Sequence, residues 1–427
     1  QAKASDIHIE PDEGLLRIRT RVDGVLQENI IQEKNIASAL VLRLKLMSGL
    51  DISEKRLPQD GRTSMRIKGH TIDVRVSTMP IQAGESVVMR LLDQSAGLLT
   101  LDQTGMPNNL LTRFRSLLHR PHGMILVTGP TGSGKTTTLY GALSELNKAA
   151  SKIITVEDPV EYRLPRINQV QTNNKIGLTF SNILRTTLRQ DPDIIMVGEM
   201  RDQETAEIGL RGALTGHLVL STLHTNDAIS SAVRLLDMGA PGYLVASSLR
   251  AVVAQRLVRK ICNNCSEDYR LNTEELLWLN SLDDNLKAIN FTRGKGCQSC
   301  NKTGYKGRIG VFELLEMTES MMNALKLNDT ITFSQAAQKS PGFIPLAKVA
   351  LMYAKMGITT VDEVLKLIEM VADERAITQP VNTAAIEQEL AQVVEEHSAN
   401  EVPNDEAPKA SGFSFELEPP GGDDGSV

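Results

Sequence analysis

Residues 129–138, GPTGSGKTTT, have the types and spacing of a site that binds the phosphates of a nucleotide. Gly129, Gly134, Lys135 and Thr136 satisfy the pattern G-x-x-x-x-G-K-[ST]. Glycines let backbone N–H groups curl around phosphates, the lysine reaches the β- and γ-phosphate oxygens, and the threonine hydroxyl binds Mg²⁺. The predicted phosphate site comprises Gly129, Pro130, Thr131, Gly132, Ser133, Gly134, Lys135, Thr136 and Thr137.

Hydrolysis of a bound nucleotide also needs groups that orient the attacking water and neutralise the developing charge. In a parallel sheet, such groups lie at the carboxyl ends of the strands. The apolar run KIITV is followed by Glu157, DIIMV by Gly198 and Glu199, and HLVLSTL by His224. One acidic residue after a strand is commonly just solvated, but acidic or imidazole groups after three strands of one domain predict a hydrolytic site.

The cysteines form two pairs, Cys262-Asn-Asn-Cys265 and Cys297-Gln-Ser-Cys300. Two CxxC turns that converge on one tetrahedral thiolate site are the simplest explanation, and zinc is the usual occupant. A redox pair is the alternative. The pairs are further apart than in a standard zinc ribbon, so we predict a small subdomain between them and a structural, four-coordinate zinc ion.

The hydrophobic patterns of the chain predict the elements that position these residues. LLRIRTRVDGVLQ indicates a hairpin that turns at Asp23 and Gly24, and residues 33–48 have helical spacing. MILVT lies directly before the phosphate site and the helical stretch TTLYGALSELN follows it, an order that disfavours a chance glycine-rich turn. Short runs that are apolar on both faces predict a parallel sheet covered by helices, hence an α/β protein.

These patterns divide the chain into predicted regions. They are a small α+β domain (1–100), a parallel-sheet domain (101–255), a tetracysteine subdomain (256–315), a C-terminal helical region (316–374) and an acidic, disordered tail (375–427). Residues 376–427 carry eleven acidic residues against one basic residue, Lys409, which is why we predict disorder there.

The overall charge and the hydropathy limit the classes of function. The net charge of −6 and the lack of a basic stripe disfavour direct binding to nucleic acid. No uncharged apolar run approaches the length that spans a bilayer, and no leader is evident, so we expect a cytoplasmic protein. Because the chain begins with Gln1 rather than Met, what precedes it is left open.

Four ordered motifs give the chain a family resemblance. GPTGSGKTTTLY, ITVEDPVEY, LRQDPDIIMVGEMRD and TGHLVLSTLHTN resemble the Walker A, Asp-box, Walker B and His-box motifs of the secretion ATPase superfamily. Within it, the chain resembles the type II secretion and type IV pilus assembly ATPases from ASDIHIEP to about residue 373. The resemblance implies a RecA-like P-loop ATPase core between the small α+β domain and the tetracysteine subdomain.

The resemblance also implies roles for residues that match the family motifs. Glu199 corresponds to the glutamate that activates water, and Arg75 and Arg90 to arginine fingers that reach the γ-phosphate. The implied catalytic set is Glu199, Lys135, Arg75, Arg90, Glu157 and His224. The implied nucleotide-binding set adds Asp158, Glu161, Arg185, Arg189 and His217 to the phosphate site, with ATP, Mg²⁺ and Zn²⁺ as the cofactors.

By the same resemblance, we expect a homo-oligomer, specifically a hexameric ring, at the inner-membrane face of a pilus or secretion machine. Its partner would be a platform protein of that membrane, and ATP hydrolysis would extract pilin-like subunits. Assembly ATPases typically carry the tetracysteine element whereas retraction ATPases lack it, which favours assembly. RLPRINQVQ and VGEMRDQETAEIGL are most similar to the mannose-sensitive haemagglutinin pilus branch.

Two alternatives from other functional classes remain open at this point. A nucleic-acid motor for DNA uptake or packaging would suit a P-loop domain, but the acidic balance argues against direct contact with nucleic acid. A scaffold that binds ATP without hydrolysing it would not need Lys135, Thr136 and Glu199 to be intact.

Overall fold

The computed structural model describes residues 4–32, 35–67, 70–93, 99–280, 282–283, 286 and 289–378. The chain divides into two compact units, Gln1–Ala376 and Ile377–Val427. The predicted acidic tail lies outside the described residues from residue 379 onward. The first unit therefore holds every part of the predicted chemistry.

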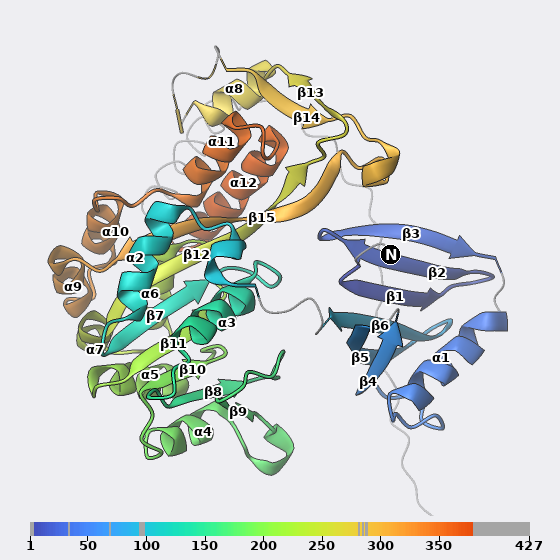
Figure 1. Cartoon of the computed structure of the whole chain (residues 1–427), viewed down its shortest axis with the longest axis horizontal. Helices are drawn as coiled ribbons and strands as arrows, with labels where there is room; N and C mark the ends of the chain where they lie inside the picture. Colours follow the sequence, from blue (N-terminus) through green and yellow to red (C-terminus); the bar gives the residue numbers. More distant parts are fainter. Residues whose placement is uncertain are drawn as a thin grey trace, which may run out of the picture. The chain divides into compact units, whose positions relative to one another are not determined.

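The N-terminal part of the first unit is an antiparallel sheet with one helix (Figure 1). The described strands pair in the order β3-β2-β1-β6-β5-β4. The strands are β1 (Asp6–Pro11), β2 (Leu16–Val22), β3 (Val25–Ile31), β4 (Gln59–Ile67), β5 (His70–Ile81) and β6 (Gly84–Asp93). The predicted hairpin is confirmed, because Asp23 and Gly24 join β2 to β3 with positive φ angles of 49° and 85°. The predicted helix is α1 (Asn35–Met47).

The two faces of this sheet have opposite character because successive side chains along a strand point to opposite sides. Val74, Val76 and Val87 are buried against Val41 and Leu44 of α1. The other face carries a row of directly opposed charged residues, one from each of five neighbouring strands. The row is Arg21, Asp6, Arg90, Arg75 and Arg62.

The second sheet has the predicted parallel core, with strands in the order β15-β12-β7-β11-β10-β8-β9 among the described residues. Every neighbouring pair is parallel except β12 and β15. The strands are β7 (Gly123–Thr128), β8 (Ile153–Glu157), β9 (Asn168–Gln171), β10 (Ile194–Val197), β11 (Leu218–Leu223), β12 (Leu249–Ile261) and β15 (Tyr305–Glu316). The central strands are buried on both faces, so the predicted α/β class is confirmed.

Helices cover both faces of this sheet (Figure 1). One buried cluster joins the sheet to α2 (Asn108–Leu118) and α3 (Lys135–Leu146). A second, larger cluster joins the opposite face to helices that follow later in the chain. These are α4 (Phe180–Thr187), α5 (Gln203–Leu214), α6 (Ala228–Asp237), α7 (Gly242–Ser248), α9 (Glu319–Lys326), α10 (Thr330–Gln338), α11 (Leu346–Lys355) and α12 (Val361–Thr378).

The cysteine segment is an insertion between two strands of the second sheet. It contains β13 (Ser266–Tyr269), α8 (Thr273–Leu279) and β14 (Phe291–Gly294), and it connects β12 to β15. The predicted limit at residue 255 falls inside β12, and the sheet continues across it. The predicted boundary at residue 255 does not coincide with the end of a strand, and the domain limits of the sequence analysis stay predictions.

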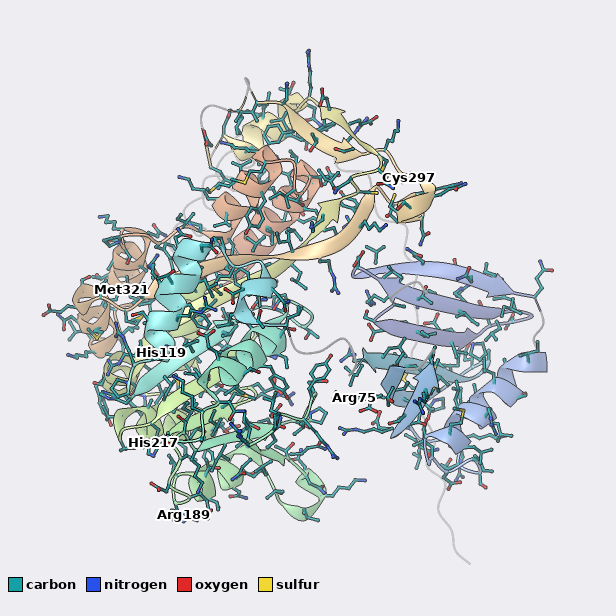
Figure 2. All side chains as sticks on the ribbon, viewed as in Figure 1. Arg75, His119, Arg189, His217, Cys297 and Met321 are labelled. Carbon is teal, nitrogen blue, oxygen red and sulfur yellow. The ribbon has the colours of Figure 1, made fainter. Side chains whose placement is uncertain are left out.

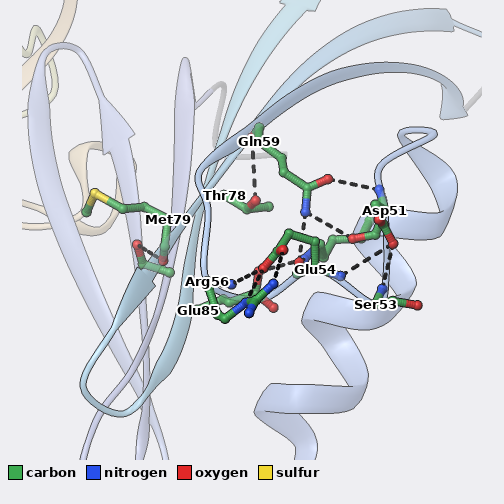
Figure 3. Close-up of polar contacts among 10 residues, drawn as sticks. Asp51, Ser53, Glu54, Arg56, Gln59, Thr78, Met79 and Glu85 are labelled. Atoms are coloured by element: carbon green, nitrogen blue, oxygen red, sulfur yellow. Dashed lines mark hydrogen bonds and ion pairs between the residues drawn. The ribbon is translucent and has the colours of Figure 1, made fainter. Parts of the chain in front are cut away.

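A buried ion pair fixes the segment between α1 and β4 on the N-terminal sheet. Lys45 is 1% exposed, and its Nζ lies 2.6 Å from Glu85 Oε1 and 2.6 Å from the Glu54 carbonyl oxygen. Figure 3 shows the adjoining contacts, in which Gln59 Nε2 donates to the carbonyl oxygens of Asp51 and Glu54. The buried pair thus joins α1 to β6 and to the segment that leads into β4.

We expect Glu85→Gln to destabilise this sheet by about 3–5 kcal/mol, because Lys45 would keep a buried charge without its counter-charge. The measurement is hydrogen exchange of the β5 and β6 amides in the full chain. Arg56→Gln is the control, since it breaks an ion pair whose arginine is 87% exposed, and exchange should hardly change. Equal amide protection in Glu85→Gln and the wild type would contradict the prediction.

Candidate active site

The phosphate loop lies between the end of β7 at Thr128 and the start of α3 at Lys135, as predicted. Gly129 and Gly134 have φ angles of 143° and 91°. A Cβ on Gly129 would lie 2.3 Å from the Gln255 carbonyl oxygen, and one on Gly134 would lie 2.7 Å from Gln255 Nε2. β12 therefore runs close against the loop, which only glycines at these positions permit.

Gln255 is a residue that sequence reasoning missed. Its Oε1 accepts a hydrogen bond of 2.7 Å from Thr138 Oγ1 of α3, and the side chain is 2% exposed. It thereby joins β12 to the helix that begins at the phosphate loop. Gln255 is far from the loop in sequence, so no local signal indicated this contact.

Lys135 is folded onto the loop that precedes it. Its Nζ donates to the carbonyl oxygens of Gly129, at 2.5 Å, and Pro130, at 3.1 Å. Burial lowers the pKa of Lys135 to about 8, Arg256 adds to the shift, and the nearby Glu199 opposes it. Thr136 and Thr137 are exposed at the start of α3, where their hydroxyls are accessible to a bound phosphate or metal ion.

Glu199 and His224 meet at the same edge of the sheet. Glu199 follows β10 and His224 follows β11, and these strands are parallel neighbours. His224 Nε2 lies 3.0 Å from Glu199 Oε2. Since β11 lies between β10 and β7, this pair is at the edge where the phosphate loop begins. The sequence prediction that these groups come together agrees with the structure.

Arg201 is a second residue that sequence reasoning missed. Its Nη2 contacts Glu199 Oε1, so each oxygen of the Glu199 carboxylate has its own donor. Burial raises the pKa of Glu199, but the hydrogen bonds from Arg201 and His224 outweigh burial and hold the pKa below its usual value. The signal was present in GEMRD, where an arginine stands two residues after the glutamate.

Glu157 is a buried carboxylate with three side-chain donors. It accepts hydrogen bonds from the Tyr140 hydroxyl, from Thr155 Oγ1 at 2.5 Å and from Gln169 Nε2 at 3.1 Å. These contacts tie α3, β8 and β9 together. Burial and the Glu157 charge raise the pKa of Tyr140, so the tyrosine stays a donor. The arrangement favours a positioning role for Glu157, and its predicted catalytic role stays a prediction.

The predicted arginine fingers are each held by a carboxylate of the same chain. Arg75 (Figure 2) binds Glu161 of the Asp box through two contacts, Nη2–Oε2 at 2.7 Å and Nη1–Oε1 at 3.1 Å. Arg90 Nε lies 3.1 Å from Asp6 Oδ1. Arg75 and Arg90 are directly opposed on β5 and β6. Asp158, the other predicted nucleotide-binding residue of the Asp box, is exposed.

His217, Arg185 and Arg189 have contacts away from the phosphate loop. His217 precedes β11, whose Leu218 pairs with Gly123 at the start of β7, so one strand length of about 20 Å separates His217 from the loop. Its Nδ1 contacts the Gly212 carbonyl oxygen at 2.9 Å. Figure 2 labels His217 and Arg189.

Arg185 and Arg189, which we expected at the nucleotide, contact residues of α5 and α4, respectively, in this chain. Arg185 pairs with Glu204 of α5 at 2.6 Å, and Arg189 Nη2 lies 3.5 Å from Thr186 Oγ1. The structure does not bring these arginines or His217 together with Glu199 through any contact among the described residues. His217 lies away from Glu199 because the His box spans the whole of β11. Its two histidines, His217 and His224, therefore flank opposite ends of one strand.

The cysteines converge as predicted. Sγ distances are 3.9 Å for Cys262 and Cys297, 3.8 Å for Cys265 and Cys300, and 3.7 Å for Cys297 and Cys300. All four sulfur atoms lie within 4.8 Å of one another. Tetrahedral coordination at a Zn–S distance of about 2.3 Å requires S–S separations of about 3.8 Å. The donor set therefore fits a tetrahedral thiolate-bound metal ion.

Comparison with known proteins decides the family. Residues 1–366 match the family described as "Type II/IV secretion system protein". The chain belongs to this family. It is 48% identical over 365 residues to the type II secretion system protein HxcR of Pseudomonas aeruginosa, covering 86% of this chain and 74% of HxcR. It is 48% identical over 369 residues to the type II secretion system ATPase E of Vibrio cholerae serotype O1, covering 85% and 72%.

Solved structures agree with this assignment. The pilus retraction motor PilT with bound ADP superposes with a TM-score of 0.57 at 27% identity, covering 86% of this chain and 93% of PilT. The ATPase DotB of Legionella pneumophila gives a TM-score of 0.63 at 20% identity, covering 86% and 92%, and shows a shared fold. This secretion ATPase thus has the predicted RecA-like core.

As a member of this family, the chain is an ATPase motor of the secretion and pilus class, and the nucleic-acid motor and the inert scaffold are not favoured. The haemagglutinin pilus branch stays a prediction. Among the described residues, no helix combines the length and apolarity that crossing a membrane requires.

For the secretion ATPase, we expect ATP affinity to fall as the pH rises above about 8, the pKa of Lys135. The charged lysine binds phosphate, and its deprotonation would weaken binding by up to about tenfold per pH unit. The dissociation constant for ATP should be measured between neutral and alkaline pH. Lys135→Arg keeps its charge and should lose this slope, whereas an identical slope in both proteins would assign the titration to another group.

Proposed function

We propose that this protein hydrolyses Mg²⁺-ATP at residues 129–137 and uses the energy to assemble a type IV pilus or a type II secretion pseudopilus. In this proposal, it acts at the cytoplasmic face of the inner membrane and extracts pilin-like subunits through a platform protein. The observation that carries the hydrolytic part is the pairing of Glu199 with His224 beside the phosphate loop. The secretory part is supported by relatives whose names place them in type II secretion systems.

In this proposal, the residues at the carboxyl edge of the sheet have different roles in hydrolysis. Lys135 would exchange the carbonyl oxygens of Gly129 and Pro130 for phosphate oxygens, because a phosphate carries the stronger negative charge. The Thr136 hydroxyl would hold Mg²⁺, which neutralises phosphate charge when bound. Glu199, kept ionised by its two donors, would orient the attacking water and accept its proton.

Arg75 and Arg90 are proposed to supply positive charge to the γ-phosphate within a ring of six identical chains. Both lie on the charged face of the N-terminal sheet, and both have carboxylate partners that a phosphate could replace. For Arg185, Arg189 and His217, whose contacts within one chain are with residues of α4 and α5, we propose a role at the ATP bound by a neighbouring subunit.

The four thiolates are proposed to hold Zn²⁺ as a structural ion. No histidine or carboxylate belongs to this cluster among the described residues, so all four ligands would be sulfur and no coordination position would remain for a substrate. The ion would fix the segment between β12 and β15.

The proposed active site and ring are tested together by mixing two inactive variants. We expect Glu199→Gln to lower kcat by about 10²–10⁴, because it removes the proton acceptor. Arg90→Ala should also lower kcat, because it removes a transition-state charge. Mixed before assembly, the two should regain activity at interfaces that combine an intact Glu199 with an intact Arg90.

Activity at baseline in mixtures that demonstrably co-assemble would contradict an Arg90 that acts across subunits. Wild-type turnover by Glu199→Gln alone would contradict the role of Glu199 itself.

The zinc proposal is tested by Cys265→Ser. We expect zinc content and thermal stability to fall together, because a thiolate ligand is lost from a buried cluster. Metal content should be measured by mass spectrometry and stability by calorimetry. Ser299→Ala, between Cys297 and Cys300, is the matched control and should keep the metal. Unchanged metal stoichiometry in Cys265→Ser would contradict the structural-zinc proposal.

A further inference from the structure

Each of the two oxygens of the Glu199 carboxylate has its own partner. His224 Nε2 lies 3.0 Å from Oε2, and Arg201 Nη2 contacts Oε1. The Glu199 side chain is 13% exposed, whereas that of Arg201 is 66% exposed. A carboxylate with a separate donor on each oxygen cannot rotate freely about its terminal bond, so the pair of contacts defines the plane of the group.

The backbone that carries Arg201 is fixed on both sides of the residue. Met200 is 3% exposed, and its N–H donates to the Thr222 carbonyl oxygen of β11 at 3.1 Å. Asp202 caps α5 by accepting a hydrogen bond of 2.8 Å from the Thr205 N–H. The exposed arginine therefore projects from a segment that is anchored in the sheet and in a helix cap, which favours a defined role over a mobile surface charge.

More positive than negative groups surround the Glu199 carboxylate. Arg201 comes from its own segment, His224 from the end of β11 and Lys135 from the start of α3. Asp158, after β8, faces Arg201, and Arg256 of β12 faces Lys135. Glu199 is thus surrounded mainly by positive groups, and Arg201 supplies the permanent charge in direct contact with it.

We propose that Arg201 is a positioning residue for Glu199, holding one carboxylate oxygen so that the group stays ionised and correctly oriented toward the attacking water. The inference rests on the proposed role of Glu199 as proton acceptor. His224, which follows the neighbouring strand β11, binds one oxygen of the carboxylate, and Arg201 binds the other. In this proposal, Arg201 acts through Glu199 and not on the nucleotide.

The test compares Arg201→Gln, Arg201→Lys and the wild type in single-turnover ATP hydrolysis from acidic to neutral pH, with ATP affinity measured separately. We expect Arg201→Gln to slow hydrolysis about tenfold with unchanged ATP affinity. Its rate should fall off at a pH about one unit higher than in the wild type, because the glutamate pKa rises when the opposite charge is lost. In Arg201→Lys, which retains the charge, the rate should fall off at the same acidic pH as in the wild type; this fall in rate at low pH is the acid limb of the profile.

Arg211→Gln is the matched control, because Arg211 also forms an exposed ion pair, with Glu207 on α5, and should behave as the wild type. The double variant Glu199→Gln/Arg201→Gln should be no slower than Glu199→Gln alone, since Arg201 acts through the glutamate. A further loss of rate in the double variant would overturn the inference, and so would a wild-type rate and acid limb in Arg201→Gln.

Weaker ATP binding with an unchanged hydrolysis rate in Arg201→Gln would make Arg201 a nucleotide ligand and would also overturn the inference. Glu199→Gln, measured in the same series, distinguishes failure of the positioning role of Arg201 from failure of the proposed role of Glu199. If it is inactive while Arg201→Gln resembles the wild type, only the positioning role fails. If Glu199→Gln hydrolyses ATP at the wild-type rate, the proposed function of Glu199 fails.

Discussion

Parallel pairing of β7, β11 and β10 is the constraint on which the active site depends. Because these strands are parallel and in close register, their carboxyl ends meet at one edge, with the phosphate loop after β7, His224 after β11 and Glu199 after β10. The strands are buried on both faces, so their positions are set by the hydrophobic cores above and below the sheet. A shift of one strand along its neighbour would move Glu199 or His224 by about 3.3 Å per residue, which the proposed proton transfer would not tolerate.

Pairing of arginine with carboxylate is the second recurring feature of the molecule. Arg201 is held by Glu199, Arg75 by Glu161 and Arg90 by Asp6. Each pair is partly or largely exposed to solvent, so its net contribution to stability is small. Partners that contribute little to stability can be exchanged at little cost, which suits the proposed binding of Arg75 and Arg90 to the phosphates of ATP.

β12 links the phosphate loop to the cysteine cluster. Its Gln255 lies against Gly129 and Gly134, and the strand ends at Ile261, directly before Cys262. Close to that end, Arg259 stacks on the ring of Tyr305, 3.8 Å from its centroid, and pairs with Glu363 of α12 at 2.8 Å. One continuous strand therefore joins two sites that are separate in sequence.

The local chemistry of this protein could be predicted from the order and spacing of its residues. The phosphate loop, the acidic and imidazole groups that follow apolar strands, and the two CxxC pairs all depend on short spacings, and a short spacing fixes the relative position of residues along one chain segment. The α/β class and the strands β7, β8, β10 and β11 followed from hydrophobic runs for the same reason.

Contacts between residues that are distant in the chain became known only from the packing of the strands and helices. Arg201 was visible in GEMRD, but its contact with Glu199 depends on the turn that follows β10. Gln255 reaches the phosphate loop because β12 pairs with β7, and His217 lies away from it because β11 runs the full height of the sheet. The continuation of the sheet through β12 and β15, on either side of the cysteine segment, likewise depends on pairing between distant strands. Such contacts join residues far apart in the chain, and their geometry is fixed by packing and strand register, which local residue spacing does not encode.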